Sequence, residues 1–262
     1  MPRLKLPLLA LALLALPACG DDGSPSNTAL DAAPGSDGAS TATCPPGQTL
    51  AIELVTDDDV QLIADLYPSG FPSGGPALIL LHMIPPSNSK ANYPTEFIQA
   101  FQERGFTVLN VNRRGATGSG GVATDAYQGL SGKLDAKAAY DYLKTECNMS
   151  WYSVMGASNG TTTAFDFAIH AAETQGLDAP ASLIVLSGGS YTENQNSISA
   201  KMSSLPGGAF FAYPSGEAGW NEGIKAIAPN WEFTEYTPGA HGTGLIGSNP
   251  EITDALLNFV DP

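Results

Sequence analysis

From residue 76 onward, short runs of apolar residues alternate with amphipathic stretches along the chain. Continuous apolar runs are typical of strands buried on both faces of a parallel sheet, and apolar positions three or four residues apart indicate helices. Strands are predicted at residues 77–81, 106–111, 151–155, 181–186, 209–213 and 231–236. Helices are predicted at residues 93–104, 133–146, 159–175, 193–204, 217–227 and 250–260. This alternation predicts an α/β fold with a mostly parallel sheet covered by helices on both faces.

Two further strands precede this region and are expected to form a hairpin. They span residues 48–55 and 60–67, with the acidic triplet Asp57-Asp58-Asp59 between them. Three adjacent carboxylates can suggest a calcium loop, but the fuller ligand spacing of such a loop is missing. A turn whose carboxylates face water is the preferred interpretation.

The first 18 residues have the pattern of an export signal. Arg3 and Lys5 give a basic start, and residues 6–16 form an apolar run that is too short to span a membrane as a helix. The end of this segment, residues 16–19 (LPAC), resembles a bacterial lipobox. That resemblance implies cleavage before Cys19 and lipid attachment to that cysteine. An ordinary signal peptide with a cysteine near its cleavage site is the alternative.

A polar segment separates this signal from the rest of the chain. Residues 20–43 are rich in Asp, Gly, Ser, Ala, Pro and Thr, and Leu30 is their only large apolar residue. Such a segment cannot bury enough surface to offset the entropy of ordering, so a disordered tether is expected. The predicted organisation is a signal peptide at residues 1–18, a tether at 19–43 and one folded domain at 44–262.

The charge balance is acidic. Of the 262 residues, 26 are Asp or Glu and 11 are Lys or Arg, and two of the basic residues lie in the signal segment. The chain after the signal therefore has nine basic residues against 26 acidic ones, a net charge near −17. This balance argues against nucleic acid or an anionic membrane surface as a binding partner.

The sequence Gly156-Ala157-Ser158-Asn159-Gly160 lies between a predicted strand and a predicted helix. This is the sequence form of a nucleophile elbow, in which a serine on a tight turn stands clear of the sheet. Side chains at Gly156 and Gly160 would collide with the neighbouring strand and helix. The helix that follows directs its N-terminal N–H groups toward an anion near Ser158.

A serine hydroxyl needs a base within hydrogen-bond reach to act as a nucleophile at neutral pH. The chain has three histidines, of which His170 lies in the middle of a predicted helix and His82 at the end of a buried strand. His241 lies in a glycine-rich loop between the last predicted strand and the last helix. From such a loop a side chain can reach a serine at the carboxyl edge of the sheet. His241 is therefore the predicted base, and His82 is expected to brace its own loop.

With these residues in this order, the chain resembles the α/β-hydrolases, in particular the compact dienelactone-hydrolase-like and esterase/lipase-like members. The resemblance covers roughly residues 48–260. It rests on the elbow and on three further short motifs: Leu81-His82, Arg114-Gly115 through Ser119, and His241-Gly242. It implies a sheet of about eight strands without a separate lid domain, and hydrolysis through an acyl-enzyme on Ser158. It implies neither a cofactor nor a metal.

The same resemblance implies where the acid of a catalytic triad should lie. The acid usually follows the strand before the histidine's strand, and this chain has Glu217 there. Glu193, after the preceding strand, is the alternative acid, and Glu222 is the next choice. A carboxylate at Glu217 can hold the imidazole and stabilise its protonated form. A glutamate in the first turn of a helix is also favoured by the helix dipole alone.

An oxyanion hole in this family uses two backbone N–H groups. One belongs to the residue after the nucleophile, which is Asn159, and the other to the loop after His82, where Met83 is expected.

Two cysteines follow Cys19 in the chain. Cys44 begins the folded part and Cys147 ends a predicted helix, so both are expected at the sheet edge away from Ser158. Export permits a disulfide between them, and two free thiols are the alternative. Neither has histidine partners at the spacing of a zinc site, so no metal is expected.

Together these observations predict a serine hydrolase that cleaves small-molecule carboxylic esters with a Ser-His-Glu triad. The lipid on Cys19 would tether it to a membrane of the cell envelope, on the periplasmic or cell-surface side. Two alternatives stay open: a binding lipoprotein that keeps the fold without activity, and an amidase or peptidase with the same triad. The sequence specifies neither the natural substrate nor the oligomeric state.

Overall fold

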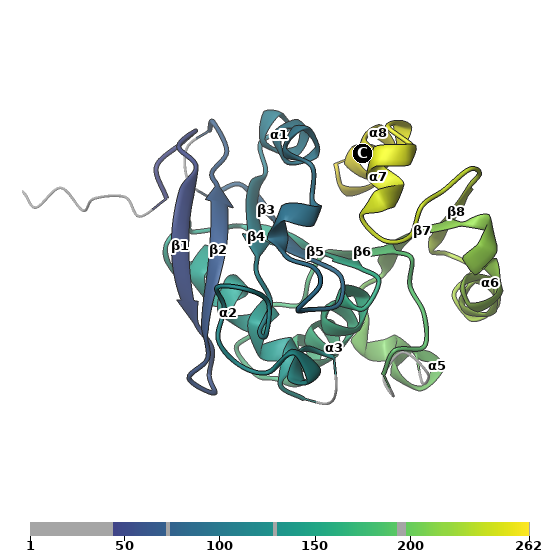
Figure 1. The fold of residues 1–262 in the computed structure, drawn as a ribbon, viewed down its shortest axis with the longest axis horizontal. Coiled ribbons are helices and arrows are strands. Elements are labelled where there is room, and N and C mark those ends of the chain that lie inside the picture. Colours follow the sequence, from purple (N-terminus) through teal and green to yellow (C-terminus); the bar gives the residue numbers. More distant parts are fainter. Residues whose placement is uncertain (1–43, 72–73, 128–129, 193–197, 262) are drawn as a thin grey trace, which may run out of the picture. The chain divides into compact units, whose positions relative to one another are not determined.

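The computed structural model describes residues 44–71, 74–127, 130–192 and 198–261. These residues form an eight-stranded sheet, with the strand order β1-β2-β4-β3-β5-β6-β7-β8, and the helices that cover it (Figure 1). β2 pairs antiparallel with both β1 and β4, and all the other neighbouring strands are parallel. The predicted α/β fold with a mostly parallel sheet is confirmed.

The strands agree with their predicted ranges to within two residues at each end. They are β1 Leu50–Val55, β2 Gln61–Tyr67, β3 Pro76–Leu81, β4 Thr107–Val111, β5 Trp151–Ala157, β6 Ser182–Leu186, β7 Gly208–Pro214 and β8 Glu232–Tyr236. The central strands are covered on both faces, and β6 is buried at every position. This burial explains why their sequences are continuous apolar runs, whereas β2, next to the edge strand β1, alternates between buried and more exposed positions.

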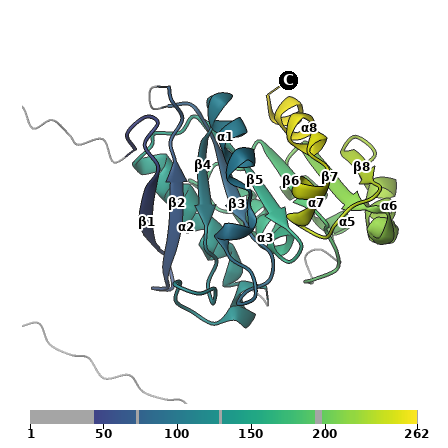
Figure 2. The same ribbon diagram turned by 45° about the horizontal axis from the view of Figure 1, so that its top comes forward.

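Helices cover both faces of the sheet, as Figures 1 and 2 show. The helices are α1 Thr95–Glu103, α2 Gly132–Thr145, α3 Gly160–Glu173, α5 Ile198–Lys201, α6 Ala218–Ile227, α7 Gly244–Ser248 and α8 Glu251–Val260. Short 3-10 helices are η1 Lys90–Asn92, η2 Ala123–Ala126, η3 Met202–Ser204 and η4 Ser215–Glu217. Apolar side chains of α2, α3 and α6 pack in one core, and those of α1, α7 and α8 pack in a second core on the opposite face.

Two helical segments differ from the sequence prediction. In the range 193–204, residues 193–197 lie outside the described residues, and the rest form α5 and a 3-10 turn instead of one helix. The sequence pattern does not predict α7, which directly follows the expected loop at 237–244. Both helices have five residues or fewer, which is too short for a helical period to show in the sequence.

The acidic turn between β1 and β2 is exposed, as predicted, and two of its carboxylates also pair with basic side chains of the domain. Asp58 accepts hydrogen bonds from Arg114 at 2.7 and 3.0 Å, and Asp57 accepts one from Lys137 at 3.2 Å. Arg114 also binds Asp135, a fully buried residue of α2. These pairs hold the hairpin against β4 and α2, and Arg114 lowers the pKa of Asp58 to about 2. Their partners are 56 and 80 residues away, so no local pattern indicates them.

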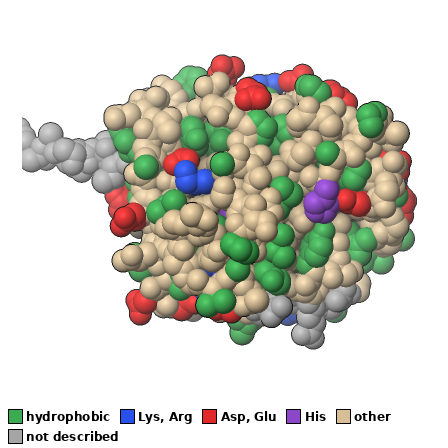
Figure 3. Space-filling model, viewed as in Figure 1, with side chains coloured by type: hydrophobic (Ala, Val, Ile, Leu, Met, Phe, Trp, Pro, Cys, Tyr) green, Lys and Arg blue, Asp and Glu red, His purple; other side chains and the backbone are tan. Residues whose placement is uncertain are grey.

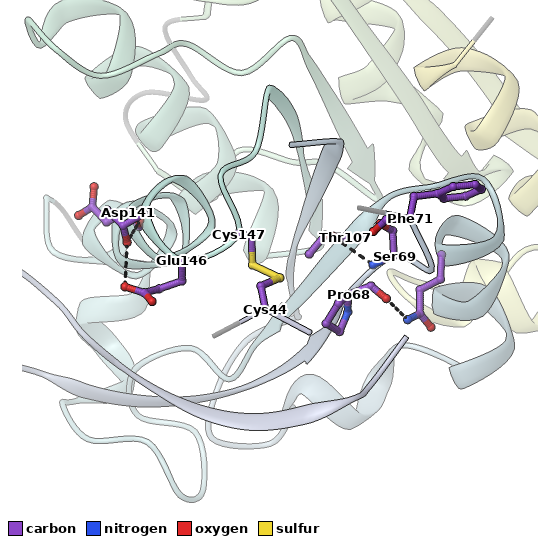
Figure 4. Close-up of a disulfide and its surroundings, with 10 residues drawn as sticks. Cys44, Pro68, Ser69, Phe71, Thr107, Asp141, Glu146 and Cys147 are labelled. Carbon is purple, nitrogen blue, oxygen red and sulfur yellow. Dashed lines mark hydrogen bonds between the residues drawn. A yellow bond between two sulfur atoms is a disulfide. The ribbon is translucent and has the colours of Figure 1, made fainter. Parts of the chain in front are cut away.

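Cys44 and Cys147 form a disulfide, with their Cα atoms 5.1 Å apart (Figure 4). The two cysteines are separated by 103 residues in the sequence, and both are buried. Of the two alternatives that the sequence left open, the structure therefore contains the disulfide. It joins the start of the folded domain to the segment that connects α2 with β5.

No helix within the described ranges is long and apolar enough to cross a membrane. The segments that connect the described strands and helices contain no inserted lid domain. The predicted signal peptide, Cys19 and the predicted tether lie outside the described residues.

Candidate active site

Ser158 lies in a tight turn between the end of β5 and the start of α3. Its φ is 50°, in the left-handed region that residues other than glycine rarely adopt. Its N–H donates to the carbonyl of Leu186 in β6 at 2.7 Å. Its own carbonyl accepts from the N–H and from the hydroxyl of Thr161, at 2.9 and 2.6 Å. The adjacent strand and the helix thus hold the strained turn that a nucleophile elbow requires.

The two glycines of the motif allow this turn to pack closely. A Cβ at Gly156 would lie 2.5 Å from the carbonyl oxygen of Gly160 at the start of α3. A Cβ at Gly160 would lie 2.3 Å from the carbonyl oxygen of Leu81 and 2.5 Å from that of His82. Both contacts are too close for a side chain, so the glycines bring α3 against the carboxyl end of β3.

The structure brings Ser158, His241 and Glu217 together. The Ser158 hydroxyl lies 2.6 Å from His241 Nε2, and His241 Nδ1 lies 2.6 Å from Glu217 Oε1. An ionised carboxylate can only accept hydrogen bonds, so Nδ1 carries the imidazole proton and Nε2 accepts from the serine hydroxyl. This is the arrangement of a nucleophile, a base and an orienting acid.

The loop that carries His241 is fixed from β6 and from the loop after β3. The N–H of Gly242 donates to the Ser187 hydroxyl at 2.8 Å, and the Ser187 N–H donates to the carbonyl of Ala212 in β7. Gly242 has a φ of 61°, and a Cβ there would lie 2.4 Å from Met83 Sδ. The base therefore lies directly against the expected oxyanion loop, with no space for a side chain between them.

Glu217 ends the η4 turn that follows β7. The fully buried Asn221 donates from its side chain to the Glu217 carbonyl at 2.8 Å. Glu217 Oε2 is buried and has no hydrogen-bond partner among the residues that the structure describes. It is Glu217, and not Glu222, that bonds to His241, and Glu222 accepts from the Tyr213 hydroxyl at 3.1 Å. Glu193, the alternative acid, lies outside the described residues.

Met83 and Asn159 lie on either side of Ser158, on the loop after β3 and at the start of α3. Within the described parts of the chain, neither backbone N–H donates to another residue. Free N–H groups on the two segments beside the nucleophile are what an oxyanion hole requires.

His82 supports this loop, as the sequence predicts. Its Nε2 accepts from the Arg113 N–H at 2.9 Å, so Nδ1 carries the proton and donates to the Met83 carbonyl at 2.7 Å. Burial, with a smaller effect of the Arg113 charge, lowers the pKa of His82 to about 3. A ring that stays neutral and keeps both nitrogens in hydrogen bonds cannot act as a base.

Sequence reasoning missed two residues of the site. Arg113 is fully buried and donates to His82, Met83 and Asn159. Its signal in the sequence is an arginine directly after a buried strand. Tyr191 donates its hydroxyl to the Ser187 carbonyl at 3.3 Å. Burial raises the pKa of Tyr191, and a hydrogen bond with the Ser158 side chain lowers it, so this phenol lies beside the candidate nucleophile.

The surface around the site is accessible on the side of the base. The side chains of His241 and Glu217 are 47% and 30% exposed. Figure 3 shows a histidine and an acidic side chain next to each other at the surface, with hydrophobic side chains nearby. In the described part of the chain, no group of three or more His, Cys, Asp or Glu side chains is arranged to hold a metal ion.

The sequence matches no protein-family model and no curated protein. The fold, by contrast, matches solved structures. An esterase from Pyrococcus furiosus has a TM-score of 0.62 at 19% identity, over 81% of this chain and 89% of that chain. An α/β serine hydrolase without a lid from Xanthomonas campestris has a TM-score of 0.62 at 14% identity, over 82% and 94%. A dienelactone hydrolase from Anabaena variabilis has a TM-score of 0.59 at 13% identity, over 81% and 94%. This chain therefore has the α/β-hydrolase fold.

Proposed function

We propose that this protein is a serine hydrolase that cleaves carboxylic esters through an acyl-enzyme. The observation that carries the proposal is the hydrogen-bonded chain from Ser158 through His241 to Glu217, with both distances at 2.6 Å. Structural neighbours that are esterases and α/β serine hydrolases support a hydrolase. The chemistry needs no cofactor.

In the first half of the proposed reaction, Ser158 Oγ attacks the ester carbonyl carbon while His241 Nε2 takes the hydroxyl proton. The carbonyl oxygen becomes an oxyanion and accepts hydrogen bonds from the N–H groups of Met83 and Asn159. Glu217 holds the imidazole and stabilises its positive charge. The imidazolium then gives its proton to the alcohol oxygen, the carbon–oxygen bond breaks, and the alcohol leaves.

In the second half, a water molecule takes the place of the alcohol. His241 Nε2 removes a proton from this water, whose oxygen attacks the acyl carbon on Ser158. The second tetrahedral intermediate uses the same two N–H groups. It collapses when the imidazolium returns the proton to Ser158 Oγ, which releases the carboxylic acid and restores the enzyme.

We also propose the cellular arrangement that the first 43 residues indicate. Lipid on Cys19 would hold the enzyme at a membrane of the cell envelope, and the polar segment up to residue 43 would keep the domain at a distance from it. Mass spectrometry of the membrane fraction, with Cys19→Ser as the comparison, tests this proposal. The substituted protein should lose the lipid and leave the membrane.

The activity is tested with short p-nitrophenyl esters and a serine-directed fluorophosphonate. Ser158→Ala should lose hydrolysis by about 10⁴-fold or more and lose labelling, because the nucleophile is absent. Ser153→Ala is the matched control, since Ser153 is a buried serine of β5, the strand before Ser158, and its hydroxyl bonds to Ser182. The Ser153→Ala variant should retain both ester hydrolysis and fluorophosphonate labelling.

Two results would decide against this function. If the wild type hydrolyses no ester and takes up no phosphonate, the protein keeps the fold as a binding protein without this chemistry. If p-nitroanilides of the same acyl groups are cleaved faster than the esters, the enzyme is an amidase or peptidase that uses the same triad.

A further inference from the structure

Arg113 is a buried cation that has no hydrogen bond to a carboxylate among the described residues, and Asp135 acts on it only through space. It directly follows β4 and is fully buried. Within the described residues, its side chain hydrogen-bonds only to neutral groups, and its Nε has no partner. Burial lowers the pKa of Arg113 to about 10, so the guanidinium is charged at neutral pH. Because burying a charge without an ion pair is strongly unfavourable, this placement calls for an explanation.

One arm of the guanidinium holds the peptide unit that carries the first oxyanion donor. Arg113 Nη1 donates to the His82 carbonyl oxygen at 2.9 Å. This carbonyl and the Met83 N–H belong to the same planar trans peptide, so they point in opposite directions. Fixing the carbonyl therefore fixes the direction of the N–H. A charged donor on the carbonyl also polarises the peptide, which makes its N–H a stronger hydrogen-bond donor.

The same planar group also contacts the residue that carries the second donor. Nη1 and Nη2 each lie 3.2 Å from Asn159 Oδ1. The backbone N–H of Asn159 is the other expected oxyanion donor. The rigid fork of one guanidinium thus sets the spacing between the two segments on either side of Ser158.

Two further contacts fix the guanidinium itself. Nη2 donates to the Thr163 hydroxyl at 2.8 Å and to the Ala126 carbonyl at 2.5 Å, and the Thr163 hydroxyl donates to the same carbonyl at 3.0 Å. The Arg113 backbone N–H donates to His82, whose ring in turn holds the Met83 carbonyl. The charged group therefore has one orientation, set by α3 and by the η2 turn.

We propose that Arg113 is a positioning residue of the oxyanion hole, which aligns the Met83 and Asn159 N–H groups and stabilises the oxyanion with its buried charge. This inference rests on the proposed function. It explains the position of the charge, because a buried cation held in one orientation stabilises a developing negative charge without reorganisation. The adjacent Arg114, by contrast, donates to the carboxylates of Asp58 and Asp135.

The test compares Arg113→Lys, Arg113→Met and the control Arg114→Lys. Arg113→Met removes both the planar guanidinium and its charge. In this variant kcat for p-nitrophenyl butyrate should fall by about 10²–10³-fold, which is the effect of removing one oxyanion-hole donor. In Arg113→Lys, which keeps the charge and loses the fork, the loss should be about tenfold smaller. KM should change by less than about threefold in both, because the ester ground state has no oxyanion. Arg114→Lys should lower the Tm and leave kcat unchanged.

A tetrahedral analogue separates this role from a purely structural one. Butylboronic acid forms a tetrahedral adduct on an active serine, so its inhibition constant should rise across the variants by the same factor as kcat falls. Thr163→Val removes one acceptor of the guanidinium at nearly constant volume. It should lower kcat by about fivefold and serves as the second variant if Arg113→Met does not fold.

The outcomes are distinguishable from those of the proposed function. If the wild type is labelled at Ser158 but Arg113→Lys and Thr163→Val keep its kcat and its boronate inhibition, the role of Arg113 is refuted and the hydrolase stands. If the wild type itself is neither active nor labelled, both proposals fail. Slower labelling of the Arg113 variants, still at Ser158, supports the positioning role.

Discussion

The two sides of the candidate site are built differently. On the oxyanion side, His82 and Arg113 are completely buried and are held by several hydrogen bonds each. On the base side, the side chains of His241 and Glu217 are 47% and 30% exposed and come from loops after β8 and β7. The loop that carries His241 is tied by side-chain bonds with Ser187, Ser248 and Asn249, and the Glu217 carbonyl accepts one from Asn221.

This difference indicates which groups of the site are held in position before substrate binds. The groups that would receive the oxyanion lie at the ends of neighbouring parallel strands, where the sheet itself fixes their spacing. The proposed base would exchange protons with substrate and water, so it and the carboxylate that holds it lie on the accessible side. We expect substitutions on the buried side to act on kcat through geometry, and those on the exposed side to be moderated by solvent.

Among the substitutions that test this difference between the buried and the exposed side, Glu217→Gln is expected to have the largest effect. The amide can no longer stabilise the imidazolium, and it can favour the wrong imidazole tautomer. We expect kcat/KM to fall by about 10²–10³-fold. This is less than the roughly 10⁴-fold loss known for a buried triad acid, because water can reach this pair. Glu222→Gln is the matched control, since among the described residues Glu222 pairs with Tyr213 and Lys225, and this variant should stay within about twofold of wild type.

A reversed result, in which Glu222→Gln is the inactive variant, would show that the acid is not the one that contacts His241. If both variants keep their activity, neither Glu217 nor Glu222 is the acid that His241 needs, and Glu193 becomes the residue to substitute next. Hydrolysis of p-nitrophenyl butyrate at pH 7 and at pH 8 is the measurement, because losing the acid should also change the pH dependence of kcat/KM.

The sequence predicts the base side better than the oxyanion side. Ser158 shows itself by the glycines on either side of it, and His241 by being the histidine in a loop after the last strand. Glu217 follows only from the usual chain order of such triads, and its contact with His241 is a contact over 24 residues. Each of these residues lies at an end of a strand or in a loop, which hydrophobic periodicity marks well.

Arg113 and Asp58 show why the rest could not be predicted. Both are charged residues in polar stretches, and their partners lie tens of residues away. The spacing of residues in the sequence contains no information on contacts such as that between Asp58 and Arg114, because they form only when β2, β4 and α2 are already in place. The disulfide is similar: the sequence permits it, but only the fold brings Cys44 to Cys147.

A smaller effect is expected where the two sides meet, at Gly242. In Gly242→Ala the new methyl group would displace the Met83 thioether, and the residue would have to keep a φ of 61°. The flexible thioether can move, so the protein should fold with a Tm only a few degrees lower. His241 and the oxyanion loop would separate slightly, and we expect kcat/KM to fall by about 30-fold. Gly247→Ala, on α7 with open space around it, should have no effect.

If Gly242→Ala retained full activity, the contact between the base loop and Met83 would have no part in aligning the site. Loss of activity with a matching loss of folded protein would show a folding defect instead. Circular dichroism melts and active-site titration with the fluorophosphonate, done on the same samples, distinguish these two results.

The smallest expected effect concerns the pH dependence of stability on the buried side. His82 has a pKa of about 3 in the fold, where burial and then the Arg113 charge oppose protonation, against about 6.5 in the unfolded chain. Between these values the unfolded state binds the proton and the folded state does not. Stability is therefore full above pH 6.5, and this residue lowers it by about 1.4 kcal/mol for each pH unit below that. Asp58, with a pKa of about 2, stabilises the fold above its unfolded value of 3.8 and loses this contribution only below that pH, so it does not affect the slope between pH 7 and 4.5.

Urea unfolding at pH values from 7 to 4.5 measures this slope, and His82→Asn should flatten it. The difference between the two proteins removes the contributions that they share, including that of Asp135, whose pKa burial raises. NMR gives a second measurement that needs no variant: the ring signals of His82 should remain those of a neutral imidazole throughout this range. A ring that titrates near pH 6 would mean that water reaches His82, and the contrast between a buried oxyanion side and an exposed base side would be lost.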